Sequence, residues 1–489
     1  MISNQVMRNG YKIWAILFIV SVSNASCKKF VTVYTPVTSV GADNVYTTDA
    51  TTAAVLTGIY TNISKADGSW SGITSLYLYA SLSADELRLF DVSRTTYNPY
   101  YTNTLNNSNT GFDYWRNIYQ LVYVANTAIE GIRSSKGLTP AVWQQSLGEA
   151  YFLRAFFYFY LTSLYGDVPL VTGTDYKTNA MLPRTPKEQV WQQIIADLHL
   201  AQGLLSVGFL DGTMVKATAA RLRPTSWAAT ALLARAYLFT GNWQGADSAA
   251  SAVISNSNFS LAPLTGSNRV FSENSVESIW QLQPVGSGAT ANTGSGLLFV
   301  LPATGPNTSG TYPVCLGNAV VNAFDSGDLR KTAWVGSVKV GTNTYYFPFK
   351  YQAGRVNTVN SEYTTVLRLA EQYLIRAEAR AQEGNISGSN SAATDLNLIR
   401  QRAGLGATSA ITQSDMLGAI LHERQVELFT EWGHRWLDLK RTGTVDVVMG
   451  APGNACVAKG GSWNSNWQWY PISQVELGAD IFLQQNAGY

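Results

Sequence analysis

The sequence predicts a mostly α-helical protein whose helices are interrupted by polar loops and short strands. Apolar side chains recur at helical steps in the stretches 50–63, 114–132, 146–166 and 185–205. The stretch 146–166 is apolar nearly all round, which is typical of a buried helix. Two other segments, 66–112 and 262–365, lack this period and are rich in Gly, Ser, Thr, Asn and Tyr. We expect them to form loops and small β elements.

Two helix pairs are predicted in addition. The first has the spacing of a tetratricopeptide repeat, with Gly241 in the turn and small or apolar residues where the helices meet: Leu233, Ala234, Tyr237, Ala246, Ala250 and Val253. A looser copy covers 369–405, where Gly384 separates the two helices. Short strands are expected in "SIWQLQ" at 278–283 and "YYFPFKY" at 345–351.

The N-terminus has the features of an export signal. Arg8 and Lys12 precede a short apolar run, and small residues follow it before Cys27. This pattern predicts a lipoprotein signal at 1–26 and a lipid anchor on Cys27, although Asn24 stands where Leu is usual. A plain secretory signal is the alternative. The run is too short to span a bilayer.

The remaining cysteines and the overall charge say less. Cys315 and Cys456 could form one disulfide or stay buried as separate thiols.

A formal net charge of +2 is too balanced for a nucleic-acid binder that relies on phosphate attraction. With 13% charged residues and 26 Tyr, much of the surface must be polar but uncharged. Such a surface suits carbohydrate contact, or simply an ordinary exported protein.

Catalytic and metal-binding motifs are absent from the sequence. His422 and Glu423 begin like a zinc-protease helix, but Val426 stands where the second histidine would be needed. No G-x-S-x-G or phosphate-binding loop occurs. Spacing alone does not exclude a carboxylate pair for glycoside hydrolysis. We therefore predict no cofactor and no metal.

Residues 422–441, "HERQVELFTEWGHRWLDLKR", carry the densest group of ionisable side chains. Arg424, Glu427, Glu431 and Arg435 fall at steps of three and four, so on one helix they would share a face. Charges that neutralise one another favour a structural role over an active site. We expect a salt-bridge network within the chain.

The ordered motifs of the chain resemble a known family. They include "LGEAYFLRAFFYFYLTSLYGDVPL", "WAATALLARAYLFTGNWQGA", "LRLAEQYLIRAEARAQEGN", "ERQVELFTEWGHRWLDLKRTG" and the terminal "QQNAGY". This set resembles the SusD/RagB family of outer-membrane lipoproteins from Cys27 to Tyr489. The charged signature of that family corresponds here to Arg424, Glu427, Glu431, Arg435, Asp438 and Arg441.

The resemblance implies a SusD-like fold, mostly α, in two regions, 27–260 and 261–489. It also implies a lipid-anchored protein on the outer membrane, facing the cell exterior, that captures glycans and has no enzymatic activity. The expected partner is a SusC-like TonB-dependent transporter. Binding of a peptide or another nutrient remains the alternative, and a glycoside hydrolase is a further one.

In the family, ligands contact loops that correspond here to 66–112 and 285–350. The aromatic candidates for stacking on sugar rings are Trp70, Tyr97, Tyr100, Tyr101 and Tyr312. Asp85 and Arg368 are the candidate polar contacts.

Overall fold

The structure is a computed structural model that describes residues 45–64, 72–356, 361–450 and 455–489. The predicted signal at 1–26, Cys27 and Trp70 lie outside the described residues. Tyr46–Tyr489 form one compact unit. The division predicted at residue 260 stays a prediction.

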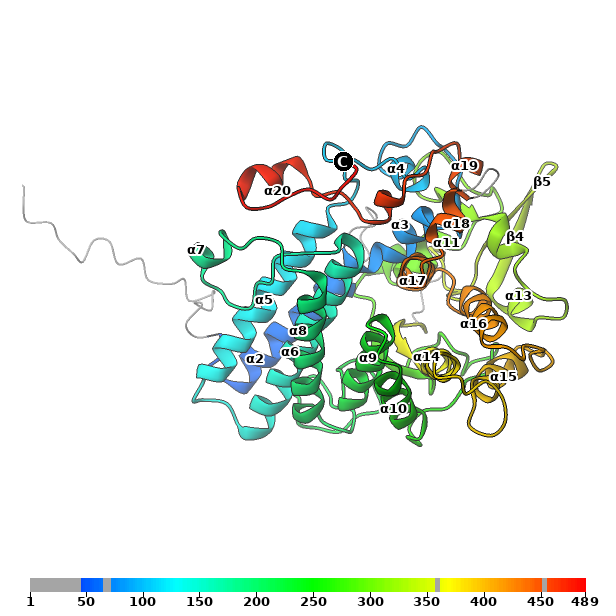
Figure 1. The fold of residues 1–489 in the computed structure, drawn as a ribbon. Coiled ribbons are helices and arrows are strands. Elements are labelled where there is room, and N and C mark those ends of the chain that lie inside the picture. The colour runs from blue at the N-terminus through cyan, green and yellow to red at the C-terminus, as the bar shows by residue number, and fades with distance from the viewer. Residues whose placement is uncertain (1–44, 65–71, 357–360, 451–454) are drawn as a thin grey trace, which may run out of the picture. The chain divides into compact units, whose positions relative to one another are not determined.

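The unit is built on a row of helices, each packed against the next (Figure 1). Helix α6 is buried along almost its whole length, as its continuous apolar sequence predicts. In order of contact the row is α5 (Tyr114–Ser134), α6 (Pro140–Tyr165), α8 (Lys187–Leu204), α9 (Ser226–Phe239), α10 (Trp243–Ile254), α14 (Leu369–Gln382) and α15 (Ala392–Arg402).

Helices α9 and α10 form the predicted tetratricopeptide-like pair. Ala246 and Ala250 are completely buried between the helices, where a larger side chain would hold them apart. Gly241 has φ +71°, which a residue with a side chain rarely adopts. Gly384 plays the same part between α14 and α15, with φ +81°. The mostly α-helical fold is therefore confirmed.

Further helices surround this row. They are α2 (Asp49–Ser64), α3 (Leu76–Ser83), α4 (Asn98–Tyr101), α7 (Tyr176–Asn179), α11 (Gly294–Phe299), α12 (Asn318–Val321), α13 (Leu329–Trp334), α16 (Gln413–Glu427), α17 (His434–Arg441), α18 (Val445–Gly450), α19 (Ala455–Ala458) and α20 (Gln474–Ala479), with 3₁₀ turns η3 (Ile73–Ser75), η4 (Gly288–Thr290) and η5 (Ser465–Gln468). None of the helices in the described part of the chain combines the length and apolar character that a membrane span requires.

The strands of the described residues form two-stranded antiparallel sheets. β1 (Leu87–Leu89) pairs with β3 (Val314–Leu316), and β2 (Ser278–Leu282) pairs with β6 (Thr364–Arg368). β4 (Val335–Val340) and β5 (Asn343–Pro348) form a hairpin. Both predicted strand segments are found, in β2 and β5, whereas the others were not predicted.

Residues 422–441 form two helices rather than one. α16 ends at Glu427 and α17 begins at His434. Between them Thr430 and Trp432 have positive φ values of +53° and +47°. Such values are strained for residues with side chains. Hydrogen bonds from Thr430 to the Glu86 carboxylate and from the Trp432 indole to the Thr365 carbonyl stabilise the turn. The prediction of one continuous helical face is wrong.

Glu427 and Glu431 instead pair with bases from distant parts of the chain. Glu427 lies 2.8 Å from Arg330, 2.6 Å from Arg368 and also contacts Arg402. Glu431 accepts from Arg368 at 2.8 Å. Burial would raise the pKa of Glu427, but the three guanidinium groups outweigh it and hold that pKa well below its usual range. We call this group the buried ionic cluster: Glu277, Asp328, Arg330, Lys350, Arg368, Arg402, Glu423, Glu427 and Glu431.

The three arginines of the segment are paired as well, whereas Lys440 forms no ion pair among the described residues. Arg424 and Arg441 both donate to Asp438 at 2.8 Å, and Arg441 also pairs with Glu378. Arg435 makes a two-point contact with Asp85, at 2.8 and 2.7 Å. Every charge in the predicted row thus has a partner inside the protein. This saturation leaves no free acid or base there for catalysis.

Candidate ligand-binding surface

The two loop segments predicted to hold ligand are joined by a small sheet. In β1 and β3, Leu87 pairs with Leu316, Arg88 with Cys315 and Leu89 with Val314. The backbone N–H of Phe90 extends the pairing by donating to the Pro313 carbonyl at 2.8 Å. Segments more than 200 residues apart therefore contribute neighbouring side chains to one surface.

Strand alternation places a guanidinium on that surface. Leu87 and Leu89 are buried, at 1% and 3% exposure, and Arg88 between them points outward. Its guanidinium carbon lies 5.6 Å from the ring centre of Tyr345, on the β4–β5 hairpin. Phe90, which is 37% exposed, packs edge-on against Tyr345 at 5.9 Å.

A pocket of about 540 Å³ adjoins Arg88. Tyr101 and Asn318 line it together with Arg88. Tyr312 is partly buried against the same small apolar cluster as Tyr345, and the guanidinium of Arg355 lies 6.0 Å from its ring centre. We call this region the Arg88 surface and define it by Arg88, Phe90, Tyr101, Tyr312, Asn318 and Tyr345.

The electrostatics of this surface are set by Arg88. Among the described residues its guanidinium forms no ion pair, whereas the nearby carboxylate of Asp85 is occupied by Arg435. Burial would raise the pKa of Asp85, but its contact with Arg435 outweighs this and lowers it. Arg88 also bonds to the thiol of Cys315, so its remaining donors and the amide of Asn318 can reach oxygen atoms of a ligand, beside aromatic faces suited to apolar C–H groups.

The predicted contact residues divide between this surface and the interior. Tyr101 and Tyr312 belong to the Arg88 surface. Tyr97 and Tyr100 are core residues at 9% and 0% exposure, because the short helix α4 turns their rings onto Tyr79. Neither of them lines the pocket beside Arg88, so the structure does not place them as stacking platforms there; Tyr101 does line the pocket, although it is itself only 7% exposed.

The two predicted polar contacts, Asp85 and Arg368, are both buried in ion pairs within the protein. Asp85 borders the pocket, but it is 8% exposed and its carboxylate is paired with Arg435. Arg368 is 2% exposed and belongs to the buried ionic cluster, where it donates to Glu277, Glu427 and Glu431. A ligand on the outside of the protein does not reach it.

Sequence reasoning missed Arg88, Phe90 and Tyr345. The only local signal was the alternation in "LRL" at 87–89, which is too short to specify a strand. Their proximity depends on the pairing of β1 with β3 and on the hairpin, which no local pattern encodes.

The described residues show neither a metal site nor a disulfide. They contain no group of three or more His, Cys, Asp or Glu side chains placed to hold a metal ion. Cys315 and Cys456 are both free and buried, so separate thiols rather than a disulfide are observed.

The fold and this surface define a helical, tetratricopeptide-like scaffold that presents an aromatic, loop-built surface. Two family models match the sequence: one described as "SusD family" over residues 277–489, and one described as "Starch-binding associating with outer membrane" over 43–238. The chain belongs to the SusD-like proteins.

Individual relatives agree with this assignment. A SusD-like protein of Formosa agariphila is 27% identical over 70% of this chain and 73% of its own length. Among solved structures, a "Laminarin binding SusD-like protein" has a TM-score of 0.71 at 24% identity, covering 90% of this chain and 99% of its own. A "Surface glycan-binding protein A from Bacteroides uniformis" has a TM-score of 0.72 at 21% identity, with coverage of 89% and 99%. These structures share the fold of this chain.

Proposed function

We propose that this protein binds glycans at the Arg88 surface and delivers them to a SusC-like TonB-dependent transporter. The observation that carries the proposal is the arrangement of Arg88 between the ring of Tyr345 and the pocket lined by Tyr101 and Asn318. Sugar rings have flat faces of C–H groups that pack on aromatic rings, and hydroxyl groups that accept from guanidinium and amide donors. The surface offers both kinds of contact side by side.

The relatives support the same ligand class. The structurally similar proteins are described as laminarin-binding and as surface glycan-binding, and one family model is described as starch-binding. The same family description, "associating with outer membrane", supports a position there. We propose that a lipid on Cys27 anchors the protein, that the protein faces the cell exterior, and that it performs no bond chemistry on the glycan.

The test is calorimetric titration of the purified protein with laminarin oligosaccharides and with starch-derived maltooligosaccharides. We expect one of them to bind, and Arg88→Ala and Tyr345→Ala each to weaken that binding by about tenfold or more, as for loss of one charged hydrogen bond or stacking contact. The matched controls are Arg133→Ala, at the exposed end of α5, and Tyr176→Ala, on a ring that is 74% exposed on α7. Neither control should change the affinity.

Two results would contradict the proposal. Unchanged affinity in both Arg88→Ala and Tyr345→Ala would show that the glycan does not bind at this surface. If no glycan binds and a peptide library yields ligands whose affinity falls with these substitutions, the Arg88 surface is a binding site for peptides and not for glycans.

A further inference from the structure

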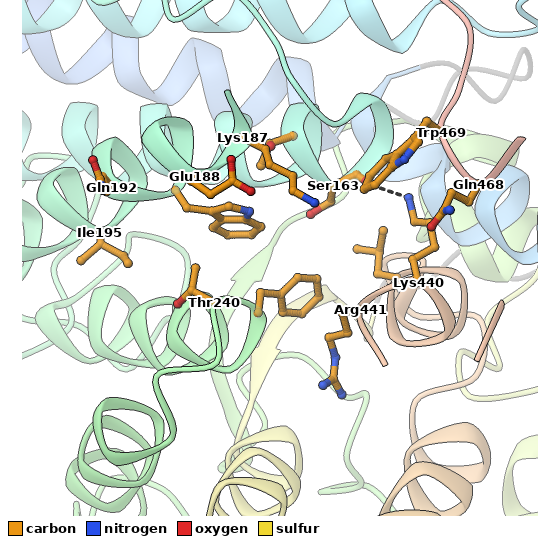
Figure 2. A pocket seen from close by; sticks show the side chains of 14 residues that line it. Ser163, Lys187, Glu188, Gln192, Ile195, Thr240, Lys440, Arg441, Gln468 and Trp469 are labelled. Atoms are coloured by element: carbon orange, nitrogen blue, oxygen red, sulfur yellow. Dashed lines mark hydrogen bonds between the residues drawn. The ribbon is translucent and has the colours of Figure 1, made fainter. Parts of the chain in front are cut away.

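A second pocket lies on a different part of the helical unit. Its volume is about 740 Å³, within the range of pockets that hold small ligands. The pocket is formed by the first turns of α8, the ends of α6 and α9, helix α17 and the residues around η5 (Figure 2). It shares no lining residue with the pocket beside Arg88.

One side of this pocket is an aromatic wall. The rings of Trp191 and Phe239 lie 5.7 Å apart, and the buried ring of Phe159 supports both, at 5.4 and 4.9 Å. Ile195 and Leu437 extend the apolar lining. A wall of this kind suits the flat apolar face of a ring-shaped ligand.

The other side is basic. The ammonium groups of Lys187 and Lys440 lie 5.6 and 4.7 Å from the ring centre of Trp469, and Figure 2 shows them reaching toward it from different helices. Lys440 donates to the carbonyl of Ser163. Within the described part of the chain, neither lysine forms an ion pair. Arg441, which also lines the pocket, is by contrast paired with Glu378 and Asp438.

The charges around Lys440 are therefore unbalanced. Burial lowers the pKa of Lys440 to about 7, and the positive charge of Lys187 acts in the same direction. Glu188 is the one acidic residue among the described residues that line the pocket; it is exposed on α8 and makes no ion pair with either lysine. Two ammonium groups thus face one cavity without a carboxylate between them.

We propose that this pocket is a second saccharide site, selective for a sugar residue that carries a carboxylate or sulfate group. An anionic group bound between Lys187 and Lys440 would relieve their mutual repulsion, and the sugar ring would pack on Trp191 and Phe239. The amide of Gln192 and the hydroxyl of Thr240 line the same space and can bond to sugar hydroxyls. That the ligand is a saccharide rests on the proposed function. The preference for an anionic group rests on the two lysines alone.

The test compares three oligosaccharides of matched length: an oligogalacturonate, a sulfated galactose oligomer and a neutral galactose oligomer. Calorimetry gives the affinities. We expect at least one acidic oligomer to bind about tenfold or more tightly than the neutral one, with affinity falling as salt is added. Whether the oligogalacturonate or the sulfated oligomer binds distinguishes a carboxylate from a sulfate ligand.

Lys187→Met and Lys440→Met keep the length and apolar stem of each side chain and should each weaken acidic binding about tenfold or more. Lys177→Met, an exposed lysine on α7, is the matched control and should change nothing. Thermal melts confirm that each variant is folded. No acidic binding, equal binding of the neutral oligomer, or unchanged affinity in both lysine variants would overturn the inference.

Arg88→Ala separates this inference from the proposed function. If the acidic oligomer is lost in Arg88→Ala but not in the lysine variants, the second site is rejected and the Arg88 surface stands. If the lysine variants remove all binding and Arg88→Ala removes none, the second site stands and the Arg88 surface is rejected.

Discussion

Lys350 and Lys440 have similar aromatic surroundings but opposite charge environments. Lys350 lies 4.0 Å from the ring centre of Phe429 and pairs with Glu431 at 2.5 Å. Lys440 lies 4.7 Å from Trp469, and its partner is a carbonyl, with a second lysine nearby. Burial lowers the pKa of both, to about 8 for Lys350, where Glu431 opposes the effect, and to about 7 for Lys440.

The difference separates structural charge from charge that is available to a ligand. In the buried ionic cluster, every base meets a carboxylate of the same chain, so the cluster is complete without anything from outside. In the second pocket and on the Arg88 surface, the described residues leave bases without acids. Density of charge in the sequence therefore does not identify a binding site here, and our two proposed sites rest instead on bases that lack an acidic partner in three dimensions.

The largest effect is expected inside the cluster. Glu427→Gln removes the carboxylate shared by Arg330, Arg368 and Arg402 and leaves their guanidinium groups short of a buried partner. We expect the free energy of unfolding to fall by about 3–5 kcal/mol, as for other broken buried pairs. Denaturant unfolding measures it, with Glu383→Gln, on an exposed glutamate after α14, as the control. Equal stability of the two variants would show that the cluster contributes nothing.

A smaller loss is expected at the edge of the cluster region. Arg435→Ala leaves Asp85 without its two-point contact, but Lys459 also faces this carboxylate and replaces part of the attraction. We expect a loss of roughly 2–4 kcal/mol in the free energy of unfolding, below that of a fully isolated charge. Arg133→Ala, on an exposed arginine, should be neutral. A variant that unfolds like the wild type yet no longer binds ligand would instead make Arg435 a contact residue.

The helical body could be predicted from sequence, because its signals are local. Alanine spacing and Gly241 identify the α9–α10 pair, and the apolar run 146–166 identifies the buried α6. The break between α16 and α17 could not be predicted in this way. Thr430 and Trp432 have positive φ, and the hydrogen bonds that stabilise them come from Glu86 and Thr365, which are distant in sequence.

The residues of the proposed binding sites were harder to predict for the same reason. The tyrosine-rich segment 97–101 predicted a ligand surface, yet burial of Tyr100 depends on its packing against Tyr79 and Tyr470. Lys440 lay inside the charged segment that was interpreted as structural. Its lack of an acidic partner becomes visible only when α17 is placed beside α8.

The smallest effect should come from the two lysines themselves. Lys350→Met removes one partner of Glu431, which keeps Arg368, so we expect the free energy of unfolding to fall by about 1–3 kcal/mol. Lys440→Met removes a charge that has no carboxylate to lose, so at pH 7 we expect stability within about 0.5 kcal/mol of wild type, or higher. Parallel denaturant titrations of the two variants measure the difference.

The pH dependence of Lys440→Met sharpens this comparison. The folded pKa of Lys440 is about 7, below the ordinary value of 10.5, so between these values the unfolded chain binds a proton that the folded protein does not. This lysine therefore makes the wild type more stable as pH rises from 7 toward 9, and Lys440→Met should lack that rise. Any stability advantage of the variant should be largest near pH 7 and shrink at pH 9. Two results would contradict this: a stability advantage of Lys440→Met that grows with pH, or a loss in the free energy of unfolding as large as that of Lys350→Met. Either would mean that contacts within the fold already stabilise the charge of Lys440, without a bound anion.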